Sequence, residues 1–205
     1  MARMIVLVST VLALLAGSAA AERFTTADGC DVREVRWGMS MSEVRRVETG
    51  EPTEIGGTLL LYPTTVNDQP CTVSYLFDRG RLCMAFYQFS DIFEEPALYF
   101  DEVAHVRDEL SAAHGAPHID KWHWEDPMFA EDPSLKADAL GLGLVQYELG
   151  WMTDRSIVAL RMAGGNRQAD ILVMYADRRC FPSGQEAFGD FFASAIGLPS
   201  PYYRQ

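Results

Sequence analysis

Gly50-Glu51-Pro52 and Gly115-Ala116-Pro117 are two Gly-x-Pro stops, and the order of elements around them decides the fold. A glycine just after a helix and a proline shortly beyond it are ordinary helix-end signals. A predicted helix precedes each stop, and several strand-like runs follow it. Because self-similarity at a fixed period indicates repeated units, this order predicts an internal duplication. The alternative is that two unrelated helices happen to stop alike.

The first predicted helix begins in the stretch Trp37-Gly38-Met39-Ser40-Met41-Ser42-Glu43-Val44. Ser40 is a good N-cap, and Glu43 stands three residues later. In such a capping box each side chain accepts a hydrogen bond from the other residue's backbone N–H. Met39 and Val44 occupy the two positions of a hydrophobic staple. The sequence therefore predicts a short helix that ends at the first stop.

Strand-like runs follow each stop. After the first stop, a turn at Asp78-Arg79-Gly80 joins two of them into a β-hairpin. After the second stop, turns at Thr153-Asp154-Arg155 and Gly164-Gly165-Asn166 separate the last three runs. The expected strands are 58–62, 71–77 and 81–89 in the first half and 119–124, 144–151, 157–162 and 171–175 in the second.

Two further helices are predicted. One begins at Pro96 and has a single apolar stripe at helical spacing, formed by Tyr99, Val103, Val106, Leu110 and Ala113. The other follows a second capping box, Ser183-Gly184-Gln185-Glu186. Its stripe is Phe188, Phe191, Phe192, Ala195 and Ile196.

These elements predict an α+β protein of two tandem helix-plus-antiparallel-sheet repeats, with the helices on one face of the sheet. The expected division is a signal peptide at 1–21, a first αβββ repeat at 22–92, a second at 93–180, and a C-terminal helix and tail at 181–205.

The N-terminus predicts export. Arg3 is followed by an apolar run from Met4 to Ala16 and by Ala19-Ala20-Ala21, a small-residue cleavage signal. A membrane anchor is the alternative, but the run is shorter than the ~20 residues that span a bilayer. We therefore expect a periplasmic or secreted protein that is cleaved near Ala21 and has no membrane span.

The charge of the chain limits its partners. With 17 basic and 29 acidic residues, the net charge is −12. An acidic protein is repelled by phosphate backbones and anionic lipid surfaces, so no nucleic-acid partner is expected.

Four cysteines, Cys30, Cys71, Cys83 and Cys180, are disulfide candidates. An even number in an exported protein favours two disulfides; the alternative is reduced, buried thiols. If the Asp78-Arg79-Gly80 turn closes a regular hairpin, Cys83 faces about Tyr75 and Cys71 faces about Tyr87. Cys71 and Cys83 are then roughly 13 Å apart along the ladder, too far to pair. Two long-range bridges, joining each of them to Cys30 or Cys180, are the expectation.

Gly38-Met39-Ser40, Val44, Gly50 and Pro52 resemble the entry of the small outer-membrane lipoprotein domain of the barrel-assembly machinery, the SmpA/OmlA type. The tandem form is similar to the β-lactamase inhibitor protein fold. This resemblance implies helices packed on an antiparallel sheet and a role in protein binding without catalysis. The helix before the first stop is one residue longer here, and the lipid-anchoring cysteine is absent.

No pattern in the sequence predicts a catalytic site, a metal site or a cofactor. His114 and His118 would share a helix face, but Gly115 and Pro117 break the helix between them. The adjacent carboxylate pairs, such as Glu94-Glu95, point apart and do not form the spaced pair of a hydrolase. We therefore expect a protein that is not an enzyme.

Aromatic residues on the predicted strands supply the candidate binding surface. A sheet with helices on one face leaves the other face to solvent or to a partner. We expect an open aromatic face that binds a protein partner, made by Tyr75, Phe86, Trp122, Trp124, Tyr147 and Trp151. The alternatives are a small-ligand or metal-binding protein that uses the region from His114 to Trp124, or a hydrolase without a recognisable motif.

Overall fold

The computed structural model describes residue 24 and residues 26–90, 93–165 and 168–181. The predicted signal peptide and the predicted C-terminal helix lie outside the described residues. Within the described part of the chain, no helix is long and apolar enough to cross a membrane.

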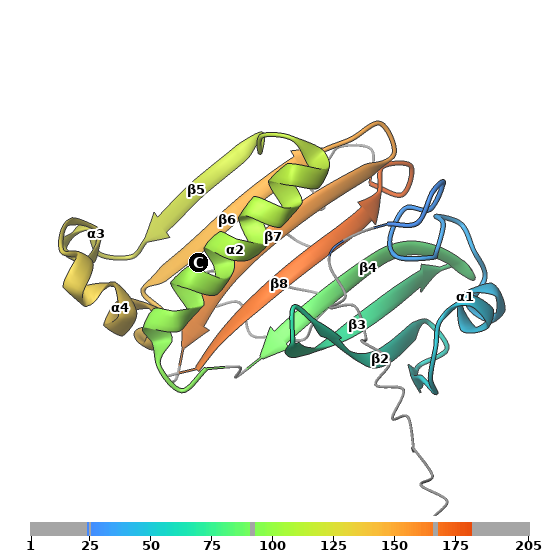
Figure 1. Ribbon diagram of the computed structural model, residues 1–205, viewed down its shortest axis with the longest axis horizontal. Helices are drawn as coiled ribbons and strands as arrows, with labels where there is room; N and C mark the ends of the chain where they lie inside the picture. Colours follow the sequence, from blue (N-terminus) through green and yellow to red (C-terminus); the bar gives the residue numbers. More distant parts are fainter. Residues whose placement is uncertain (1–23, 25, 91–92, 166–167, 182–205) are drawn as a thin grey trace, which may run out of the picture.

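One eight-stranded antiparallel sheet forms the body of the protein, with the strand order β1-β2-β3-β4-β8-β7-β6-β5 (Figure 1). The strands are β1 (Thr53–Ile55), β2 (Leu59–Val66), β3 (Gln69–Asp78), β4 (Arg81–Ser90), β5 (Ile119–Trp124), β6 (Val145–Met152), β7 (Ser156–Gly165) and β8 (Gln168–Asp177). All seven strands expected from the sequence are present, and the α+β class is confirmed. The short β1 was not expected, because its three residues are all exposed and show no alternation.

The helices are α1 (Met41–Val47), α2 (Pro96–His114), α3 (Pro127–Glu131) and α4 (Lys136–Leu142), with a 3-10 turn at Pro133–Leu135. The sequence predicted α1 and α2 but treated 125–136 as an acidic loop. Asp126 caps α3 by accepting a hydrogen bond from the Met128 backbone N–H, and Pro127 occupies its first turn. A short helix therefore forms in a segment whose proline and acidic residues had predicted a loop.

The two halves of the chain meet at the centre of the sheet, where β4 pairs with β8 from Met84–Ala176 to Ser90–Asp170. The sequence suggested two separate sheets, because it shows which runs are extended but not which runs pair. The pairing of β4 with β8 makes the sheet continuous.

The main core lies between one face of the sheet and the helices. Four residues of the predicted stripe, Tyr99, Val103, Val106 and Leu110 of α2, are buried in it, whereas the fifth, Ala113, is exposed near the helix end. Helix α2 contacts β6, β7 and β8 (Figure 1). Val44 of α1 belongs to the same core over the first half. The described helices therefore share one face of the sheet.

The opposite face carries a second, smaller core that we call the second-face cluster. It consists of strand residues only, and each of them is at most 7% exposed: Met84, Phe86, Ile157, Ala159, Leu172, Met174 and Ala176. Phe181, just beyond β8, packs against it. The centre of this face is therefore not the uncovered surface expected from the sequence.

The β3–β4 hairpin has a different register from the expected one. Asp78 pairs with Arg81, Phe77 with Leu82 and Leu76 with Met84, so Cys83 is the extra residue of a β-bulge. Sequence reasoning assumed a regular hairpin, and the bulge shifts the register around Cys83. The conclusion that Cys71 and Cys83 do not pair with each other is nevertheless confirmed.

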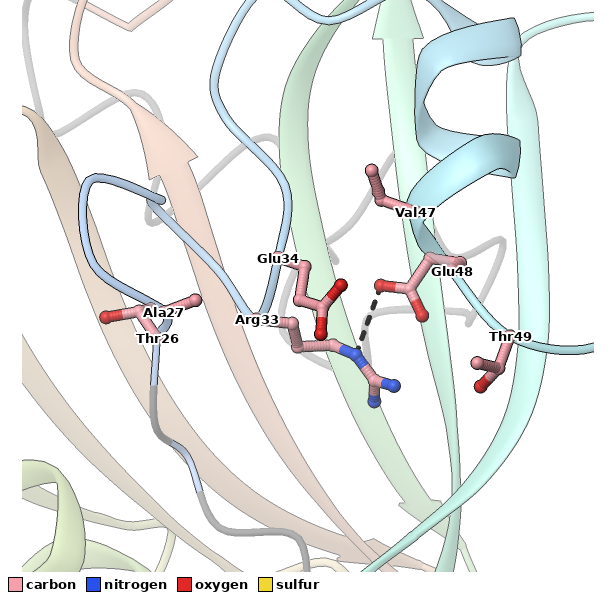
Figure 2. Close-up of a pocket in the computed structure, with 7 residues that line it drawn as sticks. All are labelled: Thr26, Ala27, Arg33, Glu34, Val47, Glu48 and Thr49. Atoms are coloured by element: carbon pink, nitrogen blue, oxygen red, sulfur yellow. Dashed lines mark ion pairs between the residues drawn. The ribbon is translucent and has the colours of Figure 1, made fainter.

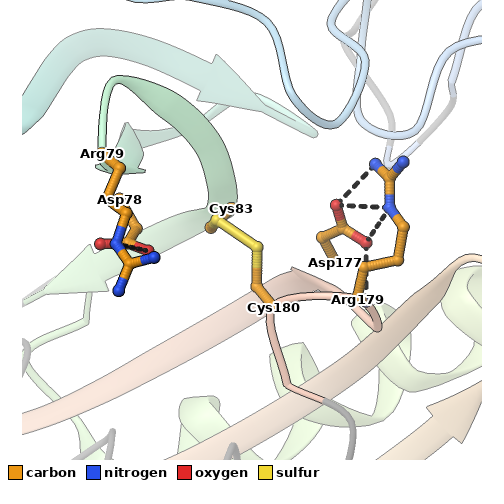
Figure 3. Close-up of a disulfide and its surroundings, with 6 residues drawn as sticks. All are labelled: Asp78, Arg79, Cys83, Asp177, Arg179 and Cys180. Carbon is orange, nitrogen blue, oxygen red and sulfur yellow. Dashed lines mark hydrogen bonds and ion pairs between the residues drawn. A yellow bond between two sulfur atoms is a disulfide. The ribbon is translucent and has the colours of Figure 1, made fainter.

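A disulfide joins Cys83 of β4 to Cys180, three residues after the end of β8 (Figure 3). One of the two expected long-range bridges is thus formed. The second is not, because Cys30 and Cys71 are not joined to each other. Cys71 lies buried in β3, and Cys30 lies half-buried in the N-terminal loop. The expectation of two bridges rested on an even count, which says nothing about the distance between the remaining pair.

The turn after β8 places Cys180. The buried Asp177 carboxylate accepts hydrogen bonds from the Arg179 guanidinium at 2.7 Å and from the Arg179 backbone N–H at 2.9 Å (Figure 3). The Cys180 backbone N–H donates to the Asp177 carbonyl at 3.0 Å. These bonds turn the chain back toward β4, where Cys83 lies.

The N-terminal loop is anchored on the far half of the sheet. The buried Asp31 carboxylate accepts hydrogen bonds from the Trp37 backbone N–H at 2.9 Å and from Arg155 at 2.7 Å. The Trp37 indole N–H donates to the Ser156 hydroxyl at 2.9 Å. Residues before α1 therefore hold the first half of the chain to the β6–β7 turn.

The capping box of α1 is formed as the sequence predicted. The Glu43 carboxylate accepts from the Ser40 backbone N–H at 2.8 Å, and the Glu43 backbone N–H donates to the Ser40 hydroxyl. Hydrogen bonds from Ser40 hold the pKa of Glu43 below its usual value.

Replacing Ser40 with Ala is therefore expected to lower the free energy of unfolding by about 1 kcal/mol, because a helix N–H loses its acceptor. The measurement is urea denaturation followed by circular dichroism. Ser42→Ala, two residues later, is the control: its exposed hydroxyl contacts the Ser40 hydroxyl at 3.2 Å but accepts no helix N–H, so its loss should cost clearly less. Equal midpoints for the two variants would contradict the role of the cap.

Candidate functional site

A pocket of about 310 Å³ lies between the N-terminal loop and the end of α1 (Figure 2). Its lining residues are Thr26, Ala27, Arg33, Glu34, Val47, Glu48 and Thr49. Figure 2 shows the Arg33 and Glu48 side chains reaching toward each other from the loop and from the helix end. The pocket thus forms where two local segments approach each other above the sheet.

Glu48 connects this pocket to the core. Its carboxylate pairs with the Arg33 guanidinium at 3.1 Å and accepts a hydrogen bond from the Tyr75 hydroxyl of β3. The Glu48 side chain is 3% exposed and that of Arg33 is 14% exposed. Burial, together with the negative charge of Glu48, raises the pKa of Tyr75 far above its usual value. Tyr75 is therefore a neutral hydrogen-bond donor here and is not a general base.

Replacing Glu48 with Gln is expected to lower the free energy of unfolding by about 2 kcal/mol. The amide keeps the shape and can still accept from Tyr75, but it removes the negative charge that faces a largely buried guanidinium. Glu54→Gln is the matched control, because Glu54 pairs with Arg45 on the surface. Denaturant midpoints measure both, and an equal loss in the two variants would contradict a structural role for the buried pair.

A second candidate site is a group of stacked rings at the β5 edge of the sheet, which we call the edge aromatic cluster: Phe100, Trp122, Trp124 and Tyr147. The Trp122 ring lies 4.1 Å from Tyr147, 5.9 Å from Phe100 and 5.8 Å from Trp124, measured between ring centroids, with interplanar angles of 14–21°. Trp122 faces Tyr147 directly across the β5–β6 ladder. Despite these contacts Trp122 remains 39% exposed.

Charged groups surround the edge aromatic cluster. The Lys136 ammonium of α4 lies 5.8 Å from the centre of the Trp122 ring. Burial and a hydrogen bond to Asp120 raise the pKa of Tyr147, and Arg107 of α2 also bonds to it. The cluster thus combines a rigid apolar surface with one cation over its exposed ring.

The six aromatic residues predicted to form one open face are distributed over three environments. Tyr75, Tyr147 and Trp151 are buried on the helix-covered face, and Phe86 is buried in the second-face cluster. Trp122 and Trp124 lie on β5, at the edge of the sheet. The single open face is therefore not formed: strand alternation turns Phe86 to the opposite face, and the helix-covered face buries Tyr75, Tyr147 and Trp151.

Sequence reasoning missed Phe100 and Lys136 as neighbours of Trp122. Phe100 follows the buried Tyr99 on α2 and lies beside the predicted apolar stripe, so the stripe did not include it. Lys136 begins a helix that the sequence did not reveal. The spacing of Trp122 and Trp124, two residues apart on a strand, was the available signal that they share a face.

The four histidines occupy separate environments. His105 pairs with Glu109 at 3.5 Å, His123 pairs with Glu148 at 3.2 Å, and His118 accepts from the Met152 backbone N–H at 3.3 Å. His114 is half-buried against the ring of Tyr175, and burial lowers its pKa. Among the described residues, no three His, Cys, Asp or Glu side chains are grouped so that they could hold a metal ion.

Comparisons of the chain with protein-family models, with curated proteins and with solved structures found no match. The class that the structure defines is an α+β protein built on one eight-stranded antiparallel sheet.

Proposed function

We propose that this chain is a non-catalytic binding protein that holds an extended segment of a partner protein against strand β5. The observation that carries the proposal is Trp122, an exposed ring fixed by three neighbouring rings at the edge of the sheet. The partner segment would lie beside β5 and place an apolar side chain over Trp122.

The edge aromatic cluster suits binding because its exposed ring is already held in place. A side chain that is fixed before association loses little conformational freedom on binding, and tryptophan is among the residues that contribute most at interfaces. The stacked contacts to Phe100 and Tyr147 supply that order in the free protein. Lys136 adds a positive charge beside the ring.

Strand β5 suits an extended partner because it is the last strand of the sheet. The edge of a sheet presents unpaired backbone N–H and C=O groups to an added strand. The four central residues of β5, 120–123, are exposed. Asp120 and Trp122 point toward the helix-covered face, whereas Lys121 and His123 point toward the opposite face.

The proposal is tested with peptides selected against the full-length protein from a random library. Trp122→Ala should weaken their binding about tenfold or more, which is the usual loss for a central aromatic contact. Met152→Ala, a change at another exposed apolar residue (49%), is the matched control and should bind normally. Methylating alternate backbone nitrogens of the peptide should also abolish binding. Unchanged affinity in both experiments would overturn the proposal.

We also propose that the protein acts outside the cytosol, in the periplasm or as a secreted protein. Residues 1–21 have the composition of a signal peptide. The Cys83–Cys180 disulfide supports this proposal, since disulfides persist in oxidising compartments. The mass of the intact exported protein should correspond to a chain that begins near Glu22, and a mass that includes residues 1–21 would contradict export.

We further propose that the two halves arose by duplication, as the resemblance to tandem SmpA/OmlA-type domains implies. Each half consists of a helix followed by four strands, and β4 and β8 are equivalent last strands that pair at the centre. From one edge of the sheet to its centre the strands are β1, β2, β3 and β4, and from the other edge to the centre they are β5, β6, β7 and β8, so each half has the same strand order. The halves differ because α3 and α4 are inserted after β5, and because α1 has 7 residues where α2 has 19.

The pocket beside α1 supports a second candidate function, the binding of a small polar ligand. Its volume of about 310 Å³ reaches the lower end of the range for ligand sites. Side chains of both charges line the pocket, the carboxylates of Glu34 and Glu48 and the guanidinium of Arg33, and Glu48 and Arg33 are already paired with each other. Calorimetric titration with small organic cations and anions tests this function, and heats no larger with the protein than without it would exclude those ligands.

A further inference from the structure

We propose that residues 183–196 of this chain dock on the second-face cluster. This face lies opposite the helices, and its cover is independent of the role proposed for β5. Three observations support the docking: the burial of that face, the position where the described chain leaves it, and the sequence that follows.

The burial of the second-face cluster requires an occupant. Its seven residues are 0–7% exposed, including large side chains such as Met84, Phe86 and Met174. The described helices that have buried apolar residues, α1, α2 and α4, place them in the core on the other face. Side chains at the centre of a sheet all stand roughly perpendicular to it, side by side, so their outer ends remain open to solvent unless another segment covers them. Another segment must therefore lie over them.

The chain reaches this face at the end of the described residues. The disulfide fixes Cys180 beside Cys83 on β4, the strand that contributes Met84 and Phe86 to the cluster (Figure 3). The next residue, Phe181, already packs against the cluster. The chain continues from there to Gln205, so the following residues begin at the place that needs cover.

The sequence after Phe181 matches such a surface. Its apolar residues have the i, i+3, i+4, i+7, i+8 spacing of one helix face: Phe188, Phe191, Phe192, Ala195 and Ile196. The residues between them are small or polar, including Asp190 and Ser194, which suits the side that faces water. A segment with one apolar stripe needs a surface on which to bury it.

The dimensions also agree. The cluster spans three neighbouring strands, β4, β8 and β7. At about 4.8 Å between strands, it is about 10 Å wide, close to the diameter of one helix. Along the strands, the cluster consists of two rows of paired residues and of Leu172. The rows are Met84–Ala176–Ile157 and Phe86–Met174–Ala159. A helix over residues 185–196 would be about 18 Å long and would cover these rows.

The other side chains on this face set the limit of the docking site. Beyond Leu172 the face becomes polar, where Arg161 bonds to Gln146 at 2.8 Å and His123 pairs with Glu148. An apolar stripe would leave these charged groups in water. The occupant therefore covers the half of the face nearer to the disulfide and leaves the β5 side uncovered.

Photo-cross-linking in the full-length protein tests the proposal. Benzoylphenylalanine in place of Phe86 should give an intrachain cross-link that mass spectrometry maps to residues 183–196. The same probe in place of Lys121, on the polar part of the face, is the control and should give no such cross-link. A cross-link to residues 1–21, a cross-link to a second copy, or no cross-link would overturn the proposal.

A second measurement does not depend on the probe. The triple variant Phe188→Ser, Phe191→Ser, Phe192→Ser should expose the second-face cluster and raise the fluorescence of a hydrophobic dye severalfold, with the far-ultraviolet circular dichroism of the sheet retained. The double variant Tyr202→Ser, Tyr203→Ser is the matched control and should leave the dye signal unchanged. An unchanged signal in the triple variant would show that its stripe covers no apolar surface.

Discussion

Replacing Trp151 with Ala is expected to lower the free energy of unfolding by about 4 kcal/mol, the usual cost of truncating a large buried aromatic residue. Trp151 stands on β6 and is 1% exposed. Its indole N–H donates to the Gly115 carbonyl at 2.9 Å, at the second Gly-x-Pro stop. The substitution therefore creates a cavity under the end of α2 and also removes the hydrogen bond that fixes this helix end to the sheet.

Two further variants separate these contributions, with urea denaturation as the measurement. Trp151→Phe keeps much of the packing and loses the hydrogen bond, so about 1–2 kcal/mol of the loss should remain. Trp122→Ala removes a tryptophan from the neighbouring strand but from an exposed position, and it should cost clearly less than Trp151→Ala. Equal losses for the two tryptophans would contradict the assignment of Trp151 to the core.

Replacing both Cys83 and Cys180 with Ala is expected to lower the free energy of unfolding by about 4 kcal/mol. The bridge joins residues 97 positions apart, so the unfolded chain gains the freedom of a long loop when it is removed. The bridge also crosses from β4 to the chain after β8, where the two halves meet. Its loss therefore loosens the central pairing of the sheet.

Denaturation with and without a reducing agent measures this effect. The reduced protein should unfold at the same denaturant concentration as the Cys83→Ala, Cys180→Ala variant. Cys30→Ala is the control, because Cys30 is half-buried and takes no part in the disulfide. Its unfolding midpoint should stay close to that of the unchanged protein. A midpoint for the oxidised protein that equals that of the double variant would contradict a stabilising role for the bridge.

The covering of the sheet changes what the protein can present to a partner. The aromatic residues on the predicted strands suggested an open sheet face as the binding surface. The helices cover the middle of one face. In the middle of the other face, the residues of the second-face cluster are at most 7% exposed. Among the described residues, the β5 edge stays accessible, and there one tryptophan is held in the open by neighbouring rings.

The local elements of this fold could be predicted from the sequence alone. The capping box of Ser40 and Glu43, the stripe of α2 and the glycine-bearing hairpin turn depend on residues close in the chain. Their physical causes are hydrogen bonds and side-chain spacing within a few residues, so a single sequence contains them. The prediction that Cys71 and Cys83 do not pair was also local, because both residues stand on one hairpin.

Only the tertiary structure decided how these elements combine. The pairing of β4 with β8, the bulge at Cys83 and the choice of Cys180 as its partner depend on distances between residues far apart in the chain. The same is true of the aromatic residues. Tyr75 and Trp122 both occupy strands, but Tyr75 lies under α1 and is hydrogen-bonded to Glu48, whereas Trp122 lies at an edge. Strand alternation assigns a residue to a face, and only the packing of whole elements decides which faces and edges meet water.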